Sequence, residues 1–428
     1  MSLFLPISWP FSIEKLPKTA YLVGGSVRDQ LLQRRSSHLD LDFVLPDRAV
    51  ETASEIAAAY NVGFVVLDEA RQIARVVFEQ VTVDFAQQQG DRIEDDLRRR
   101  DFTINAIAFH PHSQTLIDPL KGQADLAAKI IRMVSYQNLA DDPLRLMRAY
   151  RQAAQLNFAL EKETQIAIGD LAPKLQQISM ERIRSELDAL LSSAAGSTQL
   201  DSIRQNQLLA FCLPQFNQES VERIKAIDDA IAQIQSTYPT YAQTLCGWTQ
   251  PVPSSCYRSW IKATKLSCLL SSNVATATQE LTRLKYSRSE AQVVLKLIKA
   301  QFAIDEMRNG PPDRAEQFFL FKAVGSAFLA LALLALALGV KMSVLKPMIE
   351  RFLDPEDAIA HAHPLLSGTL LMQQLDISPG PEIGQLLAAV EQAQAEGKIK
   401  TQTDAIAWVK KQYSRGGSRP ISPYIAER

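Results

Sequence analysis

The chain has 428 residues, of which 46% are hydrophobic and 22% are charged, and its formal net charge is −1. This length predicts two to four domains, and the near-neutral charge excludes a generally cationic nucleic-acid binder, so any nucleic-acid site must be a local basic patch. The four cysteines fit neither a CxxC pair nor a zinc pattern, which indicates thiols in a reducing compartment. The first seventeen residues have no basic start and no long apolar run, so we expect no signal peptide and a cytoplasmic protein.

Alternating and continuous apolar runs in the first quarter of the chain predict a small sheet. The predicted strands are 19–25, 39–46, 62–68, 74–80 and 81–87, and the predicted helices are 26–33 and 49–60. After about residue 139 we expect the strands to stop, because the remaining segments have helical periodicity. This order is typical of an α/β or α+β domain with a small sheet, followed by a long helical body.

One apolar run, residues 323–340, carries no charge and approaches the length of a membrane span. It is rich in Ala, lies at the short limit for a span and has no partner span in an otherwise charged chain. We therefore expect a helix buried in an all-helical domain, and we expect no stable association with a membrane.

Two carboxylates interrupt the predicted strand 39–46. Residues i and i+2 of a strand point to one face, so Asp40 and Asp42 lie side by side while Leu39, Leu41 and Phe43 face a core. Parallel like charges are costly unless a cation lies between them, and one or two Mg²⁺ ions would serve. A third carboxylate could come from the predicted strand 81–87, where Asp84 is the best candidate. Taken alone, a DxD pattern fits a solvated edge strand better.

A double glycine, Gly24 and Gly25, stands between the first predicted strand and the helix that follows. Glycine lets backbone N–H groups approach a ligand closely, and the helix start with Arg28 one turn further favours an anion. A plain strand-to-helix turn with a surface arginine is the alternative. Together with the two aspartates, this turn predicts a site for a nucleoside triphosphate.

Seven segments then occur in an order typical of one family. They are LVGGSVRDQLL, LDLDF, RRRDFTINAIAF, LIDPLKGQADL, DDPLRLMRAYRQA, ERIRSEL and LSGTLLMQQLDISPGPEIGQLL. The chain resembles the bacterial tRNA nucleotidyltransferase and poly(A) polymerase family, the second class of CCA-adding enzymes. The resemblance implies an α+β chain: a polymerase-β-type nucleotidyltransferase head with a small mixed sheet over 1–138, then an all-helical neck over 139–200, body over 201–340 and tail over 341–428.

The resemblance also implies a role for each matching residue. Asp40 and Asp42 would hold the catalytic Mg²⁺, with Asp84 as third carboxylate, and ERIRSEL would brace the helices below. The family usually has Glu where Asp141 stands. For the nucleotide, the resemblance implies Gly24, Gly25 and Arg28 at the triphosphate and Arg100 and Asp101 near the ribose. It implies Asp142 and Arg145 at the base, with Arg148 and Arg151 nearby on the triphosphate or the base.

Helical periodicity over 141–153 places Asp142, Arg145 and Arg148 on one polar edge of a single predicted helix. Arg151 falls beside the apolar arc, where a structural ion pair is the alternative. An Asp/Arg pair can read a base edge, because the carboxylate accepts from the amino group of adenine or cytosine and the guanidinium donates to the ring nitrogen. Guanine and uracil present the opposite pattern, so the pair selects ATP and CTP without a template. An ordinary i, i+3 surface pair is the alternative.

The RNA partner is expected to be the acceptor arm of a tRNA at its 3′ end, held through its shape and phosphates. Basic residues that could hold it are Arg34 and Arg35, and near the C-terminal end Lys410, Lys411, Arg415 and Arg419; a solubilising charge cluster is the alternative.

The predicted function is thus template-independent addition or repair of the 3′-terminal CCA, with CTP and ATP as substrates and pyrophosphate as leaving group. Three activities fit: CCA, CC only or A only. In this family they are said to differ in a loop between the DxD strand and RRRDFT, and here LDFVLPDRAVETA resembles some enzymes of split activity, which favours a partial activity and a complementary partner enzyme. A poly(A) polymerase and a non-catalytic RNA-binding relative are the alternatives.

Overall fold

The computed structural model describes residues 9–34, 39–247 and 259–414. Two compact units divide the chain. Of the described residues, the first unit contains those up to Val221 together with Thr282–Lys285, and the second contains the rest. Each unit is described below by itself.

A mixed seven-stranded sheet forms the N-terminal part of the first unit, in the order β3-β4-β5-β2-β1-β6-β7. β2 and β5 run parallel, and the other neighbours are antiparallel. The bounds are Tyr21–Val23 (β1), Leu39–Leu45 (β2), Gly63–Asp68 (β3), Ile73–Val77 (β4), Val81–Gln87 (β5), Ala108–His110 (β6) and Thr115–Ile117 (β7). The predicted α+β class with a small mixed sheet is confirmed.

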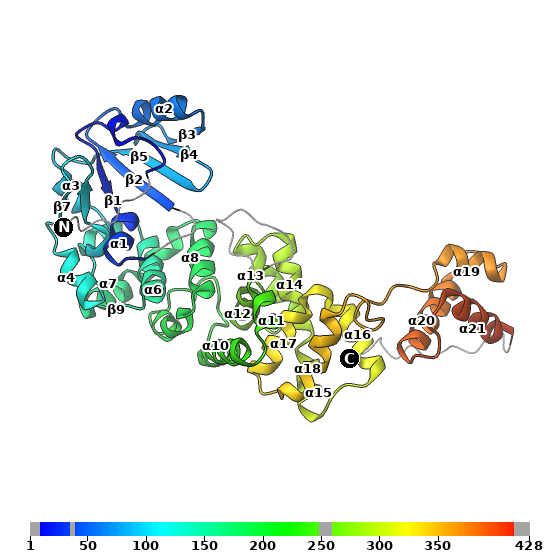
Figure 1. The fold of residues 1–428 in the computed structure, drawn as a ribbon. Helices are drawn as coiled ribbons and strands as arrows, with labels where there is room; N and C mark the ends of the chain where they lie inside the picture. Colours follow the sequence, from blue (N-terminus) through cyan, green and yellow to red (C-terminus); the bar gives the residue numbers. More distant parts are fainter. Residues whose placement is uncertain (1–8, 35–38, 248–258, 415–428) are drawn as a thin grey trace. The chain divides into compact units, whose positions relative to one another are not determined.

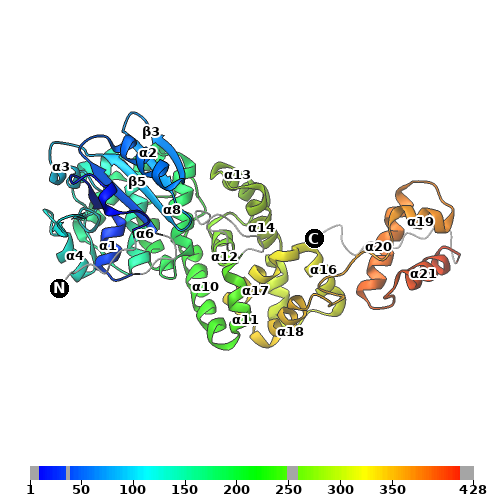
Figure 2. The same ribbon diagram turned by 45° about the horizontal axis from the view of Figure 1, so that its top comes forward.

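The two faces of this sheet differ in chemistry. On one face, α2 (Ala49–Tyr60) packs against β3, β4 and β5, as Figures 1 and 2 show. The rings of Phe43 and Phe85 stack with their centroids 5.4 Å apart, and both are buried. Because side chains alternate along a strand, Asp40, Asp42 and Asp84 point to the opposite face. The apolar core therefore fixes the orientation of the carboxylates.

Short helices and a helical layer complete the first unit. α6 and α8 pack against each other, and α5 packs against α7. The bounds are Gly25–Leu31 (α1), Ile93–Leu97 (α3), Gly122–Ala128 (α4), Tyr136–Asp141 (α5), Leu144–Leu156 (α6), Lys162–Leu171 (α7), Met180–Ser192 (α8) and Leu200–Gln205 (α9).

Four short strands were not predicted from the sequence: β6, β7 and a two-stranded parallel pair, β8 (Ile130–Ile131) and β9 (Ala159–Leu160). The expectation that strands stop after about residue 139 is therefore wrong for β9. Strands of two or three residues contain too few side chains to show a period, so pairing with a distant segment decides their conformation.

The second unit is helical throughout its described part. Its helices are Gln218–Thr237 (α10, which begins in the first unit), Pro239–Cys246 (α11), Trp260–Leu269 (α12), Val274–Arg283 (α13), Arg288–Lys299 (α14), Gln301–Asn309 (α15), Arg314–Val324 (α16), Phe328–Ala337 (α17), Met342–Leu353 (α18), Gly368–Leu375 (α19), Pro381–Ala395 (α20) and Gln402–Ser414 (α21).

The apolar run 323–340 folds mainly into α17, which packs against α11, α12 and α18 (Figure 2). By length and composition alone, the continuous stretch Arg314–Ala337 could cross a membrane. In the structure Gly325, with φ +54°, separates α16 from α17, and every residue from Phe328 to Ala335 is buried inside the unit. The prediction of a buried helix is confirmed.

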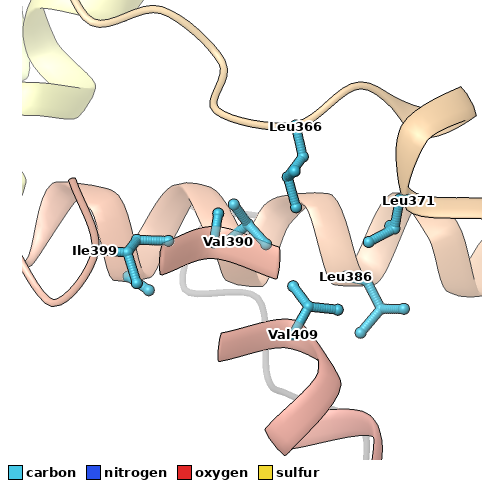
Figure 3. Packing of buried hydrophobic residues seen from close by; sticks show 8 residues of the cluster. Leu366, Leu371, Leu386, Val390, Ile399 and Val409 are labelled. Atoms are coloured by element: carbon cyan, nitrogen blue, oxygen red, sulfur yellow. The ribbon is translucent and has the colours of Figure 1, made fainter. Parts of the chain in front are cut away.

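The last three helices have an apolar cluster of their own (Figure 3). Leu366, Leu371 and Leu386 meet Val390, Ile399 and Val409 there, so the loop before α19, the helices α19 to α21 and the segment before α21 close around one small core.

Leu331 offers a test of the core position of α17. Leu331→Ala removes a fully buried side chain, so we expect a loss of about 2–5 kcal/mol in the free energy of unfolding in aqueous buffer, measured by urea titration with helical circular dichroism. The matched control is Phe302→Ala in the same unit, whose side chain is 67% exposed and which should change stability by about 0.5 kcal/mol or less. Equal, small effects of both substitutions would contradict a core helix.

Candidate active site

The glycine turn lies directly beside the carboxylates. Gly24 has φ +76°, a conformation that suits glycine, and precedes α1. A Cβ atom built on Gly24 would lie 3.4 Å from Oδ2 of Asp42 and 3.4 Å from Nη1 of Arg100. The backbone, one carboxylate and one guanidinium therefore converge at this turn, which brings three of the predicted site residues together.

The three aspartates come from two neighbouring strands. In the parallel ladder Asp42 is opposite Asp84, and Asp40 is opposite Thr82, so all three side chains share one face. Asp40 is exposed, whereas Asp42 and Asp84 are partly buried. Burial raises the pKa of Asp42, the charges of Asp84 and Asp40 raise it further, and Arg100 acts in the opposite direction. Asp42 thus carries a charge that its surroundings only partly offset.

Asp84 differs from the other two because an arginine of the next strand holds it. Nε of Arg75 donates to Oδ1 of Asp84 at 2.7 Å, and Nη2 donates to Oδ2 at 2.8 Å. Within the described residues, no group of three His, Cys, Asp or Glu side chains is arranged to hold a metal ion. Asp40 and Asp42 nevertheless supply hard carboxylate oxygens on one face, the donors that a divalent cation prefers, and their mutual repulsion would be relieved by one.

Arg100 lies in the turn that follows α3 and is anchored by a residue of that helix. Its Nε and Nη2 donate to Oδ2 of the buried Asp96 at 3.2 and 2.9 Å. Asp96 was not predicted as a site residue, although its i, i+4 spacing to Arg100 was visible in the sequence. The pair keeps the guanidinium of Arg100 beside Gly24 and Asp42.

A chain of hydrogen bonds joins three predicted residues through one that was missed. Nη1 of Arg28 donates to Oδ1 of Asn105 at 2.8 Å, and Nδ2 of Asn105 donates to Oδ1 of Asp101 at 2.9 Å. Oδ2 of Asp101 in turn pairs with Nε of Arg148 at 2.8 Å, and Asn105 also donates to Oε1 of Gln152. The chain fixes α1 and α6 relative to the turn that carries Asp101. An isolated Asn in an apolar run gives no sequence signal for such a role.

The carboxyl of Asp101 is almost fully buried. Burial alone would raise its pKa, but the charge of Arg148 and the hydrogen bonds from Asn105 and the backbone N–H of Phe102 outweigh that effect and lower the pKa. Asp101 is therefore held as a carboxylate that orients Arg148.

Asp142 and Arg145 are held by different partners. Oδ2 of Asp142 accepts from Nη2 of Arg182 on α8 at 3.1 Å. Nη1 of Arg145 donates to the backbone carbonyls of Arg99 and Asn138 at 3.1 and 3.0 Å. The expectation that one helix carries both residues is wrong for Asp142, because α5 ends at Asp141, Pro143 follows, and α6 begins only at Leu144. Arg182 was predicted only as part of a bracing segment.

The remaining predicted residues have other partners or lie on the surface. Arg151 pairs with Glu186 of α8 and donates to Gln155 at 2.7 Å, the structural ion pair that was the alternative for it. Lys410 and Lys411 lie on α21, where Lys410 donates to Oε1 of Gln374 at 2.9 Å. Arg34 is exposed. Arg35, Arg415 and Arg419 lie outside the described residues.

This fold and this arrangement of groups define a nucleotidyltransferase of the polymerase-β type. Family models match along the chain: "Poly A polymerase head domain" over residues 20–132, "Probable RNA and SrmB- binding site of polymerase A" over 157–220 and "tRNA nucleotidyltransferase domain 2 putative" over 258–409. The chain belongs to the bacterial tRNA nucleotidyltransferase and poly(A) polymerase family, the second class of CCA-adding enzymes, as its motifs predicted. Enzymes of this family use a divalent metal.

Curated relatives cover nearly the whole chain. It is 42% identical to the CC-adding tRNA nucleotidyltransferase of Synechocystis sp., over 93% of this chain and 95% of that one. It is 33% identical to the A-adding tRNA nucleotidyltransferase of Deinococcus radiodurans, over 92% and 96%. It is 30% identical to the CCA-adding enzyme of Streptococcus gordonii, over 91% and 93%. The predicted tRNA nucleotidyltransferase is confirmed, and the poly(A) polymerase alternative is not favoured.

Solved structures agree on the fold. A CCA-adding enzyme in complex with ATP superposes with a TM-score of 0.68 at 21% identity, covering 92% of this chain and 91% of that one. The Thermotoga maritima CCA-adding enzyme complexed with tRNA gives a TM-score of 0.65 at 22% identity and covers 92% and 91%.

Asp101 provides a prediction with a defined pH dependence. Asp101→Asn removes the partner of Arg148 and should lower the free energy of unfolding by about 1–3 kcal/mol at pH 7. Because the pKa of Asp101 is lower in the folded protein, its contribution is present above the unfolded pKa of about 3.9 and is lost as the pH falls through the folded pKa.

The two proteins should therefore converge in stability below about pH 4. Thermal unfolding between pH 3 and pH 8 measures this difference. A gap between wild type and Asp101→Asn that stays constant over the whole range would contradict a charged role for Asp101.

Proposed function

We propose that this enzyme adds the two C residues of the 3′-terminal CCA to tRNA, with CTP and Mg²⁺, and releases pyrophosphate. The observation that carries the proposal is the 42% identity, over almost the full length of both chains, to a CC-adding tRNA nucleotidyltransferase. A terminal A would then require a complementary enzyme, and we place the reaction in the cytoplasm.

The structure of the segment between β2 and Arg100 supports an enzyme that adds only C. Cytosine and adenine offer the same amino donor and ring-nitrogen acceptor, so an Asp/Arg pair alone accepts both, and only a change in the space around the base separates them. Here four-residue and three-residue turns join β3 to β4 and β4 to β5. Gln72 donates from its N–H to the carbonyl of Glu69, and Phe78 to that of Val81. Such tight hairpins leave no long segment that could reshape the site between a pyrimidine and a purine.

Asp40 and Asp42 would hold the Mg²⁺, with Asp84 as the third carboxylate. When bound, the metal would lower the pKa of the RNA 3′-hydroxyl and neutralise the triphosphate. Gly24, Gly25 and Arg28 line the turn where we place the triphosphate, and the bond from Arg28 to Asn105 fixes the direction of that guanidinium.

We place the ribose and the base beside residues whose side chains are held by neighbouring groups. We place the ribose at Arg100 and Asp101, and Arg148 beside it, because Asp96 and Asn105 hold these side chains in place. Asp142 would accept from the amino group of cytosine and Arg145 would donate to its ring nitrogen, with Arg182 orienting the carboxylate of Asp142. Arg151 would act near this group only through its partner Glu186.

The tRNA would be held mainly by its backbone. Lys410 and Lys411 on α21, together with Arg415, are the proposed contacts in the C-terminal segment 341–428. The matching functional division is a catalytic head over 1–138, a base-recognition neck over 139–200 and a body over 201–340.

Three tRNA transcripts test the proposal: one that ends at the discriminator base, one at CC and one at CCA. Each is incubated with the protein, Mg²⁺ and one labelled nucleoside triphosphate, and Asp40→Asn/Asp42→Asn serves as the inactive control. We expect two C residues on the first transcript, none on the others, and no use of ATP, GTP or UTP.

The other outcomes separate the alternatives. Addition of A to the CC transcript would replace the proposal with an A-adding or a full CCA-adding enzyme. Long A tails on any RNA would indicate a poly(A) polymerase. Binding of tRNA without incorporation would indicate a non-catalytic relative.

A further inference from the structure

Arg75 lies in the same row of side chains as the catalytic carboxylates. In the sheet register Arg75 of β4 is opposite Asp84 of β5, and Asp84 is opposite Asp42 of β2, so the three side chains stand on one face in consecutive strands. On its other side Arg75 is opposite Val65 of β3, which offers no charge. The guanidinium therefore meets negative charge on the side of the active site.

The contact with Arg75 engages both oxygens of the Asp84 carboxylate. Both oxygens accept from the planar fork of the guanidinium, at 2.7 and 2.8 Å, which is the strong bidentate form of this pair. The side chain of Asp84 is 23% exposed and that of Arg75 is 42% exposed, so water screens the pair only in part. A metal ion at Asp84 would therefore have to share these oxygens with the guanidinium of Arg75, or displace part of this contact.

The count of charges leads to the same point. Asp40, Asp42 and Asp84 carry a formal charge of −3 when ionised, which Arg75 beside Asp84 and Arg100 beside Asp42 reduce to −1. The hydrogen bonds and charge of Asp84, and at longer range the charges of Asp40 and Asp42, raise the pKa of Arg75, so its guanidinium stays charged beside Asp84. A fixed positive charge at this place repels a divalent cation and competes with it for Asp84.

We propose that Arg75 is a built-in counter-cation, which occupies Asp84 and weakens the binding of divalent cations to the enzyme before nucleotide arrives. The inference rests on the proposed function in one respect, namely that Asp40 and Asp42 hold the metal. Under this proposal, tight metal binding needs the phosphate oxygens of the bound triphosphate. Arg75 is then a positioning residue, because it acts through Asp84.

Titration of the full-length protein with Mn²⁺, without nucleotide or RNA, tests the proposal; free Mn²⁺ is followed by electron paramagnetic resonance. Arg75→Gln should bind Mn²⁺ roughly tenfold more tightly than wild type, because one nearby positive charge is removed and Asp84 is released. Arg75→Lys keeps the charge and should stay near the wild-type affinity. The matched control is Arg71→Gln, on the same hairpin but paired with Asp68, which should change nothing.

A double substitution shows whether the effect runs through Asp84. In Arg75→Gln/Asp84→Asn the gain in Mn²⁺ affinity should be lost, since no carboxylate is left to release. Unchanged or weaker Mn²⁺ binding by Arg75→Gln, with circular dichroism showing an intact fold, would overturn the proposal. So would a lack of detectable binding in every variant.

The titration contains no tRNA, so its result is independent of the nucleotide that the enzyme adds. A tighter Arg75→Gln together with a failed C-addition assay would overturn the proposed function and leave the inference standing. A normal C-addition assay with no change in Mn²⁺ affinity would leave the proposed function standing and overturn the inference.

Discussion

The repulsion between neighbouring carboxylates is the constraint on which this structure depends. Asp42 is opposite Asp84 in the ladder and two residues from Asp40, and burial adds to the cost of its charge. A sheet selected for stability alone would not place these groups together. The cost is tolerated because the opposite face of the same strands carries a buried apolar core, and because Arg75 and Arg100 approach the carboxylates from two sides.

The arginines of the site follow one principle of construction: each has a fixed acceptor that limits its motion. Asp96 holds Arg100, Asn105 holds Arg28, Asp101 holds Arg148, and two backbone carbonyls hold Arg145. Long flexible side chains lose entropy when they order, and preformed contacts reduce what remains to be lost on binding a nucleotide. The positive groups are thus in place before the substrate arrives.

Much of the fold could be predicted from the sequence, because its main strands and helices have clear periods and the motif order is specific. The carboxylates, the glycine turn and Arg100 could be placed for the same reason. The supporting residues could not. Asn105 acts through Arg28, 77 positions away on α1, and Arg75 acts through Asp84, nine positions away; tertiary packing brings the first pair together and the sheet register the second. Asp142 was misplaced because the sequence period continues past Pro143 while the backbone breaks there. The base-reading and metal-binding roles themselves stay predictions.

Thermal unfolding of wild type and Asp42→Asn, each in EDTA and in Mn²⁺, tests the central claim most directly. If the carboxylates are kept for a cation at the expense of stability, Asp42→Asn is the more stable protein in EDTA, and Mn²⁺ raises the melting temperature of wild type but not of the variant. A less stable variant in EDTA, or equal stabilisation of both proteins by Mn²⁺, would contradict the claim.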